Sequence, residues 1–147
     1  MKDKKKNILF MLHLPPPVHG SSIVGEIIKD SRLINNHFQG RYINLLLSRK
    51  VSETGKVKTS KTIRFSIIWF HLLGKLIHKR PDLCYFALTT TGAGFRKDVM
   101  LVFLLRLFKV KIIYHIHNKG IKYEKKTWFN NLLYRFVFKN QYVILLS

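Results

Sequence analysis

Five short, nearly continuous apolar runs constrain this chain more than any other feature. They are rich in Ile, Leu, Val, Tyr and Phe, and they occupy residues 7–12, 41–47, 82–88, 111–117 and 141–146. A strand with one solvated face alternates apolar and polar residues, whereas a strand buried on both faces of a parallel sheet is apolar throughout. The runs therefore predict five buried strands of a parallel sheet.

Longer patterns with helical periodicity separate these runs. We expect four helices, at residues 21–34, 60–79, 95–108 and 125–139. Strands that alternate with helices predict an α/β fold, here a single Rossmann-like, doubly wound parallel sheet of about five strands flanked by helices. We expect one domain over residues 1–147, in which the polar, aperiodic residues 48–59 form a flexible surface loop.

Composition narrows the classes of function. The chain has 147 residues, of which 47% are hydrophobic, and its net charge is +20 from 27 Lys and Arg against 7 Asp and Glu. Such an excess implies an anionic neighbour: nucleic acid, an anionic membrane surface or a phosphorylated substrate. The apolar stretches at 63–77 and 99–108 are too short and too polar to predict a membrane span. The lone Cys84 excludes an intramolecular disulfide and is expected to be buried.

In a sheet of this kind, ligands bind beyond the carboxyl ends of the strands. The first such loop, after residues 7–12, reads HLPPPVHGSS and ends the strand with prolines. Gly20 permits close approach of the backbone, and Ser21 or Ser22 is expected to cap a helix whose first N–H groups attract an anion. These residues leave two interpretations open, a phosphate-binding loop with His19, Gly20 and Ser21, or a turn followed by a helix cap.

Two further loops are candidates. The segment TTTGAGFRKD supplies Thr91 and Gly92, and Arg96 with Lys97 in the expected first helical turn. Cations there oppose the helix dipole, which favours an anion-binding role, although a solvated surface pair remains the alternative. His115 and His117 lie two residues apart at the end of a strand, so both point to the same face. With no suitable third ligand we expect no metal, and a hydrogen-bonding role for a histidine instead.

The order of these segments resembles a known family. A strand that leads into a Gly-containing loop is followed by PDLCYF, VKIIYHIHNKG, a helix and QYVILLS. This order resembles the N-terminal half of GT-B-fold glycosyltransferases of the retaining family 4 group, over nearly the whole chain and most clearly over 81–147. In that family the first loop carries a Gly-Gly pair, at whose position this chain reads His19-Gly20. A functional histidine follows a later strand, where His117 is the best match and His115 the second.

The resemblance implies an activity and a set of site residues. The activity is transfer of a sugar from a nucleotide-sugar donor to a hydroxyl of a glycan or lipid-linked acceptor in bacterial polysaccharide synthesis. The donor is a substrate, so no cofactor is expected. His117 is the catalytic candidate, and the candidates for acceptor or phosphate binding are His19, Gly20, Ser21, Thr91, Gly92, Arg96, His115 and Asn118.

The resemblance also implies what the chain lacks. Family members have a second, C-terminal domain with an acidic E-x-7-E motif, and nothing here matches that motif. We therefore expect the acceptor-binding half of an enzyme, inactive without a C-terminal domain or a separate subunit that carries it. Because such enzymes often act on lipid-linked acceptors, and because the chain is basic, we expect a cytoplasmic protein peripheral to an anionic membrane surface. The alternative is a basic nucleic-acid-binding or non-catalytic interaction module, which the scattered cations and the lack of a known motif disfavour.

Overall fold

The computed structural model describes residues 5–47, 59–117 and 128–145. The elements follow one another as β1 (Asn7–Leu12), α1 (Gly20–Asp30), α2 (Arg32–His37), β2 (Gln39–Asn44), α3 (Thr59–His78), β3 (Leu83–Leu88), α4 (Gly92–Leu107), β4 (Lys111–Ile116), α6 (Trp128–Phe138) and β5 (Tyr142–Leu145). All five predicted strands are present within a few residues of their expected ends.

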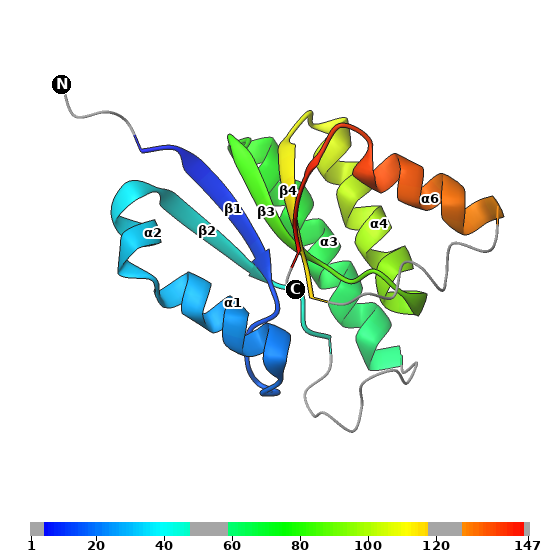
Figure 1. The fold of residues 1–147 in the computed structure, drawn as a ribbon, viewed down its shortest axis with the longest axis horizontal. Coiled ribbons are helices and arrows are strands. Elements are labelled where there is room, and N and C mark those ends of the chain that lie inside the picture. The colour runs from blue at the N-terminus through cyan, green and yellow to red at the C-terminus, as the bar shows by residue number, and fades with distance from the viewer. Residues whose placement is uncertain (1–4, 48–58, 118–127, 146–147) are drawn as a thin grey trace.

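The five strands form one sheet in the order β2-β1-β3-β4-β5, and each pair of neighbours is parallel. Helices α1 and α2 lie on one side of the sheet, and α3, α4 and α6 lie on the other (Figure 1). This arrangement confirms the predicted α/β, Rossmann-like fold. The direction in which strands are added reverses between β1 and β3, so the crevice expected to receive a ligand opens at the carboxyl ends of these two strands.

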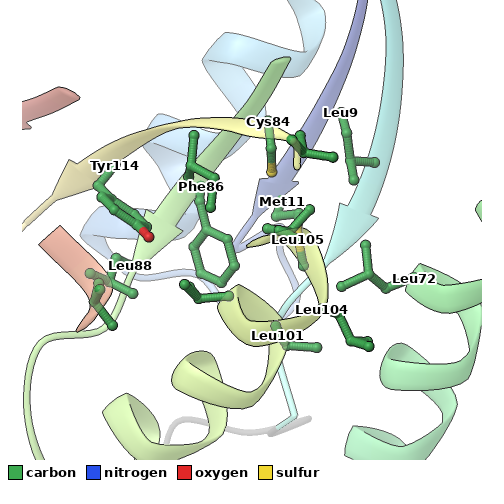
Figure 2. Close-up of a cluster of buried hydrophobic side chains, with 14 of the residues drawn as sticks. Leu9, Met11, Leu72, Cys84, Phe86, Leu88, Leu101, Leu104, Leu105 and Tyr114 are labelled. Carbon is green, nitrogen blue, oxygen red and sulfur yellow. The ribbon is translucent and has the colours of Figure 1, made fainter. Parts of the chain in front are cut away.

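The larger part of the core lies between the sheet and helices α3, α4 and α6. Inward side chains of the strands, among them Met11, Cys84 and Phe86, are fully buried there. Figure 2 shows the Phe86 ring beside Leu101 and Leu105 of α4, with Leu72 of α3, Leu104 and Tyr114 in the same layer. Alternate residues of each strand therefore point toward this face, because successive side chains of a strand point to opposite faces of the sheet.

A smaller cluster lies under α1 and α2. It contains Ile8, Phe10, Leu12 and Ala87, and Phe10 stacks on Tyr42 of β2 with ring centroids 5.0 Å apart. Helix α1 approaches the end of β1 closely at Gly25, where an added Cβ would lie 2.0 Å from the carbonyl oxygen of His13. Only glycine fits at this point, so Gly25 sets how closely α1 packs against the sheet.

One predicted helix, at 21–34, is two helices in the structure. Helix α1 ends at Asp30, and Ser31 is both its C-cap and the N-cap of α2, with φ −63° and ψ 113°. The Ser31 hydroxyl accepts a hydrogen bond from the backbone N–H of Ile34 at 3.4 Å. The prediction of a continuous helix was wrong because a serine can bond to nearby backbone and thereby start a new helix.

Strand β5 also differs from expectation. The prediction that all five strands are buried on both faces holds for β1, every residue of which is buried. It is wrong for β5, every residue of which is exposed, and for β2, in which only Ile43 is buried. The reason is position. β2 and β5 are the outer strands of the sheet, whereas β1 lies between β2 and β3, and α1 and α2 contribute Ile28 and Ile34 to the cluster over it. Apolar composition alone does not distinguish an outer strand from a central one.

Two predictions concern residues outside the part of the chain that the structure describes. The surface loop expected at 48–59 lies outside the described residues, except for Thr59, which begins α3. Asn118 lies outside them as well. Within the described part of the chain, no helix combines the length and the apolarity needed to cross a membrane.

Candidate functional site

The candidate site lies at the carboxyl edge of β1, β3 and β4. His13 directly follows β1, Thr89 follows β3, and His117 follows β4. Because these three strands are neighbours and parallel, their following residues meet at one edge, on either side of the crevice between β1 and β3. The prediction that the loops after these strands share one edge of the sheet is confirmed for their described residues.

Four histidines gather at this edge. The rings of His13 and His19 lie edge to face with centroids 6.3 Å apart, and those of His115 and His117 lie 4.2 Å apart. The second pair confirms that His115 and His117 point to the same face of the sheet. Tyr85 of β3 lies beside them, because its hydroxyl is hydrogen-bonded to Nδ1 of His115.

Burial keeps most of these imidazoles neutral. Burial lowers the pKa of His13 to about 4, and the positive charges of His19 and His117 lower it further. Burial also lowers the pKa values of His115 and His117, and the charge of His117 contributes to the shift of His115. At neutral pH each of these three rings therefore has one N–H donor and one nitrogen acceptor.

Two ring nitrogens in this cluster have unused hydrogen-bonding capacity. Nδ1 of His13 and Nε2 of His115 are buried and have no hydrogen-bond partner among the described residues. A buried polar atom without a partner is costly, which makes both nitrogens candidates for hydrogen bonds to a ligand.

The start of α1 differs in detail from the prediction. His19, not Ser21 or Ser22, is the N-cap. The Ser22 hydroxyl is buried, where it accepts the backbone N–H of His19 at 2.9 Å and donates to the carbonyl of Pro17 at 3.0 Å. Ser21 Oγ lies 3.0 Å from Nδ1 of His19. An added Cβ at Gly20 would meet no atom of the described residues within 4 Å, so the first turn of α1 opens to solvent.

The connection from β3 to α4 lies between the two histidine pairs and is shorter than predicted. Helix α4 begins at Gly92, at φ +62°, with Thr91 as its N-cap. Arg96 is exposed and, with Lys97, lies in the second turn and not in the first. The two cations therefore oppose the helix dipole less than predicted, since that effect fades after one turn.

Hydrogen bonds to α4 and α6 hold this connection in place. The backbone N–H of Thr89 donates to the Asp98 carboxylate at 2.8 Å, and the Tyr134 hydroxyl of α6 donates to the carbonyl of Thr90 at 2.6 Å. Burial raises the pKa of Asp98 to about 7, although the hydrogen bonds from Thr89 lower it. An added Cβ at Gly94 would lie 2.7 Å from Cγ2 of Thr89, so this glycine permits the close contact.

The structure thus brings His19, His115 and His117 together, and it puts Thr91 at the end of the adjacent connection, Gly92 at the start of α4 and Arg96 in the second turn of that helix. Sequence reasoning missed His13 and Tyr85. His13 follows β1 as His117 follows β4, and this equivalence could have identified it. Tyr85 is two residues before Ala87, the register partner of His115, so the period of two places it on the same face.

The described residues include no group of three His, Cys, Asp or Glu side chains arranged to hold a metal ion. Comparisons with protein-family models, with curated proteins and with solved structures find no match for this chain. The groups of the site are neutral imidazoles beside an open helix N-terminus, a combination suited to a ligand with both hydroxyl and anionic groups.

Proposed function

We propose that this chain is the acceptor-binding half of a glycosyltransferase. It would act in the transfer of a sugar from a nucleotide-sugar donor to a hydroxyl of a glycan or lipid-linked acceptor. One observation carries the proposal: His13, His115 and His117 are held neutral by burial at the carboxyl edge, and two of their nitrogens have no partner among the described residues. Neutral imidazoles match sugar hydroxyls, which both donate and accept hydrogen bonds.

Each group has a role in this proposal. His117 contacts the sugar that is transferred, and His115, oriented by Tyr85, binds a hydroxyl of the acceptor. Gly20, exposed at the start of α1, approaches a phosphate. The histidines lie on one side of a cleft whose other side is a C-terminal domain or a separate subunit. One side alone neither excludes water nor orients two substrates, so the isolated chain is inactive.

The test is reconstitution with a nucleotide-sugar-binding domain encoded next to this chain, followed by a transfer assay. His117→Ala should lower kcat at least tenfold in the reconstituted enzyme, because the contact to the transferring sugar is lost. His71→Ala is the matched control, since His71 is exposed on α3 and should have no effect. Turnover of a nucleotide-sugar by the 147-residue chain alone would show that it is not half an enzyme.

The proposal includes a peripheral location at the inner face of the cell membrane. The charge of +20 supports it, since cations near an anionic leaflet gain about 1 kcal/mol each. Exposed apolar side chains on α3 and α4 also support it, and we call them the outer helix face: Ile63, Ile67, Phe70, Ile77, Met100, Phe103 and Leu107. Contiguous exposed apolar surface with basic neighbours is typical of proteins that lie on membranes.

A further inference from the structure

A cleft of about 570 Å³ lies at the amino edge of the sheet, where β1, β2, β3 and β4 begin. We call it the amino-edge cleft. Lys6, Lys79, Arg80 and Lys111 line it, and all four are exposed. Strands of six residues separate this edge from the histidine cluster by roughly 20 Å, at about 3.3 Å per residue. The cleft is therefore a different site from the one proposed to bind sugar.

The lining of the amino-edge cleft has a large excess of positive charge. Lys5 also lines it, so its lining has five cationic side chains and one carboxylate, Asp82. That carboxylate is already engaged, because its Oδ2 accepts the backbone N–H of Asn7 at 2.8 Å. Clustered like charges repel one another, and an anion in the cleft would remove this repulsion.

Helix ends explain only part of the cluster. Lys5 Nζ donates to the carbonyl of Asn35 in α2 at 3.2 Å, and Lys79 and Arg80 follow the last turn of α3. Cations at these positions stabilise the helix dipole without any ligand. Lys6, however, directly precedes β1, and Lys111 begins β4 three residues after Phe108, the C-cap of α4, so neither lies in the last turn of a helix. Because the dipole effect fades beyond the last turn, it does not account for these two cations.

The floor of the amino-edge cleft is rigid. Arg41 Nε donates to Asn7 Oδ1 at 2.9 Å, and Arg41 Nη2 donates to the carbonyl of Lys79 at 2.7 Å. The backbone N–H of Asp82 donates to the carbonyl of Asn7 at 2.9 Å. Asn7 is 5% exposed, and its buried Nδ2 has no partner among the described residues. An unused amide donor in a lining rich in cations points to a ligand with oxygen acceptors.

A second cleft, of about 440 Å³, continues along the same edge to β5. Lys111 lines both clefts, and the second one adds Arg106 and Lys109. Lysine ammonium groups and arginine guanidinium groups are the side chains that bind phosphate most strongly. We propose that the amino-edge cleft binds two or more neighbouring phosphate groups, either of a free oligophosphate or of phospholipid headgroups.

The first measurement is titration of the full chain with inorganic tripolyphosphate by calorimetry, and with vesicles of phosphatidic acid in phosphatidylcholine by sedimentation. The test variant is Lys79→Gln with Arg80→Gln. The charge-matched control is Lys29→Gln with Arg135→Gln, which removes two exposed cations that do not line the cleft. Exposed substitutions of this kind barely change stability, so both variants should fold.

We expect about tenfold weaker binding in the test variant, because two charge-assisted contacts are lost, and less than twofold in the control. Weakening with tripolyphosphate identifies a free oligophosphate as the ligand, and weakening confined to vesicles identifies headgroups. Either result supports the site. Equal weakening of both variants in both arms would overturn it, because it would show that net charge alone drives binding.

A second measurement locates the ligand independently of any variant. In ¹⁵N-labelled protein, tripolyphosphate should shift the side-chain amide resonances of Asn7, and the His117→Ala protein should show the same shifts. Shifts restricted to Gly20 and Ser21 would contradict the amino-edge cleft. Because this readout involves neither sugar nor turnover, its outcome is independent of the proposed function.

Discussion

At the residue scale, the charge of this protein and its candidate site are separated. Burial lowers the pKa values of His13, His115 and His117, so these three imidazoles are neutral near pH 7. Lys6 and Lys111 lie at the opposite edge. A net charge of +20 therefore does not mean a positively charged site at the histidines. Their chemistry is that of paired donors and acceptors, whereas the amino edge has the chemistry of fixed positive charge.

Gly25→Ala should destabilise the protein, although alanine is the better helix former. The new Cβ would lie 2.0 Å from the carbonyl oxygen of His13, and backbone cannot move aside cheaply. We expect a loss of about 1–3 kcal/mol in the free energy of unfolding, as for other overpacked sites. Gly74→Ala on α3 is the control, because its Cβ would meet none of the described atoms within 4 Å, and it should gain up to about 1 kcal/mol. Urea denaturation measures both, and equal effects would contradict the close contact.

Asp98→Asn should change how stability depends on pH. The folded protein raises the pKa of Asp98 from 3.8 to about 7, so between these values it binds a proton that the unfolded chain releases. The Asp98 term therefore makes the wild type less stable as pH rises from 4 to 7, and it is constant above that range. The stability of the variant relative to wild type should rise across this window, on the order of 2–4 kcal/mol.

Unfolding by urea at pH 4, 5, 6, 7 and 8 measures this difference. The comparison with wild type is necessary because His13, with its pKa lowered to about 4, contributes the opposite slope between that value and 6.5. His13 is present in both proteins, so its term cancels. A stability difference that stays flat from pH 4 to 7 would refute a raised pKa for Asp98.

At the scale of elements, α6 contacts both α4 and the connection after β3 and stabilises their positions. Arg106 of α4 donates to the carbonyl of Phe136 and, at 3.4 Å, to that of Lys139, and its guanidinium lies 4.8 Å from the centre of the Phe136 ring. The Tyr134 ring stacks on Phe95 with centroids 4.4 Å apart, while its hydroxyl reaches the carbonyl of Thr90. A helix late in the chain thus helps to shape the candidate site.

Tyr134→Phe should loosen this connection while keeping the ring stack with Phe95. It removes the 2.6 Å hydrogen bond to the buried Thr90 carbonyl, which should cost about 1–2 kcal/mol. Amide exchange of residues 89–91 should become faster. Tyr42→Phe is the control, because its 3.0 Å bond to Asn35 Oδ1 is exposed and should contribute little. Unchanged exchange in the Tyr134 variant would mean that this bond does not hold the connection.

The sequence predicted an element correctly where a pattern of apolar residues determines it. It did not do so where a single polar residue determines where the element ends. Continuous apolar runs were enough to find β1, β3 and β4, because burial on both faces leaves no other composition. The break at Ser31 was missed because serine is tolerated inside helices and acts as a cap only when the chain turns there. At the site, His115 and His117 were found from their place at a strand end. Tyr85 was missed because its partner comes from another strand, which only the sheet register reveals.

At the scale of the whole molecule, the two sides of the sheet are unequally covered. Among the described residues, α3, α4 and α6 cover one side and the shorter α1 and α2 the other, and β5 has no second neighbour in the described sheet. The layer of α3, α4 and α6 has the outer helix face on its solvent side, where the side chains of Ile67 and Phe70 are 62% and 65% exposed. An apolar face on a strongly basic protein is the feature that links fold to location in our proposal.

Vesicle binding should depend on this face as well as on charge. The protein should sediment with anionic vesicles, and less so at high salt because the attraction is screened. Ile67→Asn with Phe103→Asn should reduce the bound fraction several-fold, since less apolar surface enters the interface. Ile27→Asn with Leu33→Asn is the control, because these residues are similarly exposed on α1 and α2 across the sheet. Equal sedimentation with neutral vesicles would contradict the electrostatic part of the proposal.

The buried thiol of Cys84 can be used to measure how often the sheet opens. Its thiol lies at 0% exposure in β3, and burial raises its pKa, so the reactive thiolate is almost absent from the native state. Alkylation by a neutral thiol reagent can then proceed only through molecules in which β1, β3 and α4 have separated. Because the chain has one cysteine, each modified molecule carries one adduct, and the fraction of molecules with the added mass measures how many have reacted. The alkylation rate, followed by mass spectrometry, therefore reports the rare open population in the absence of denaturant.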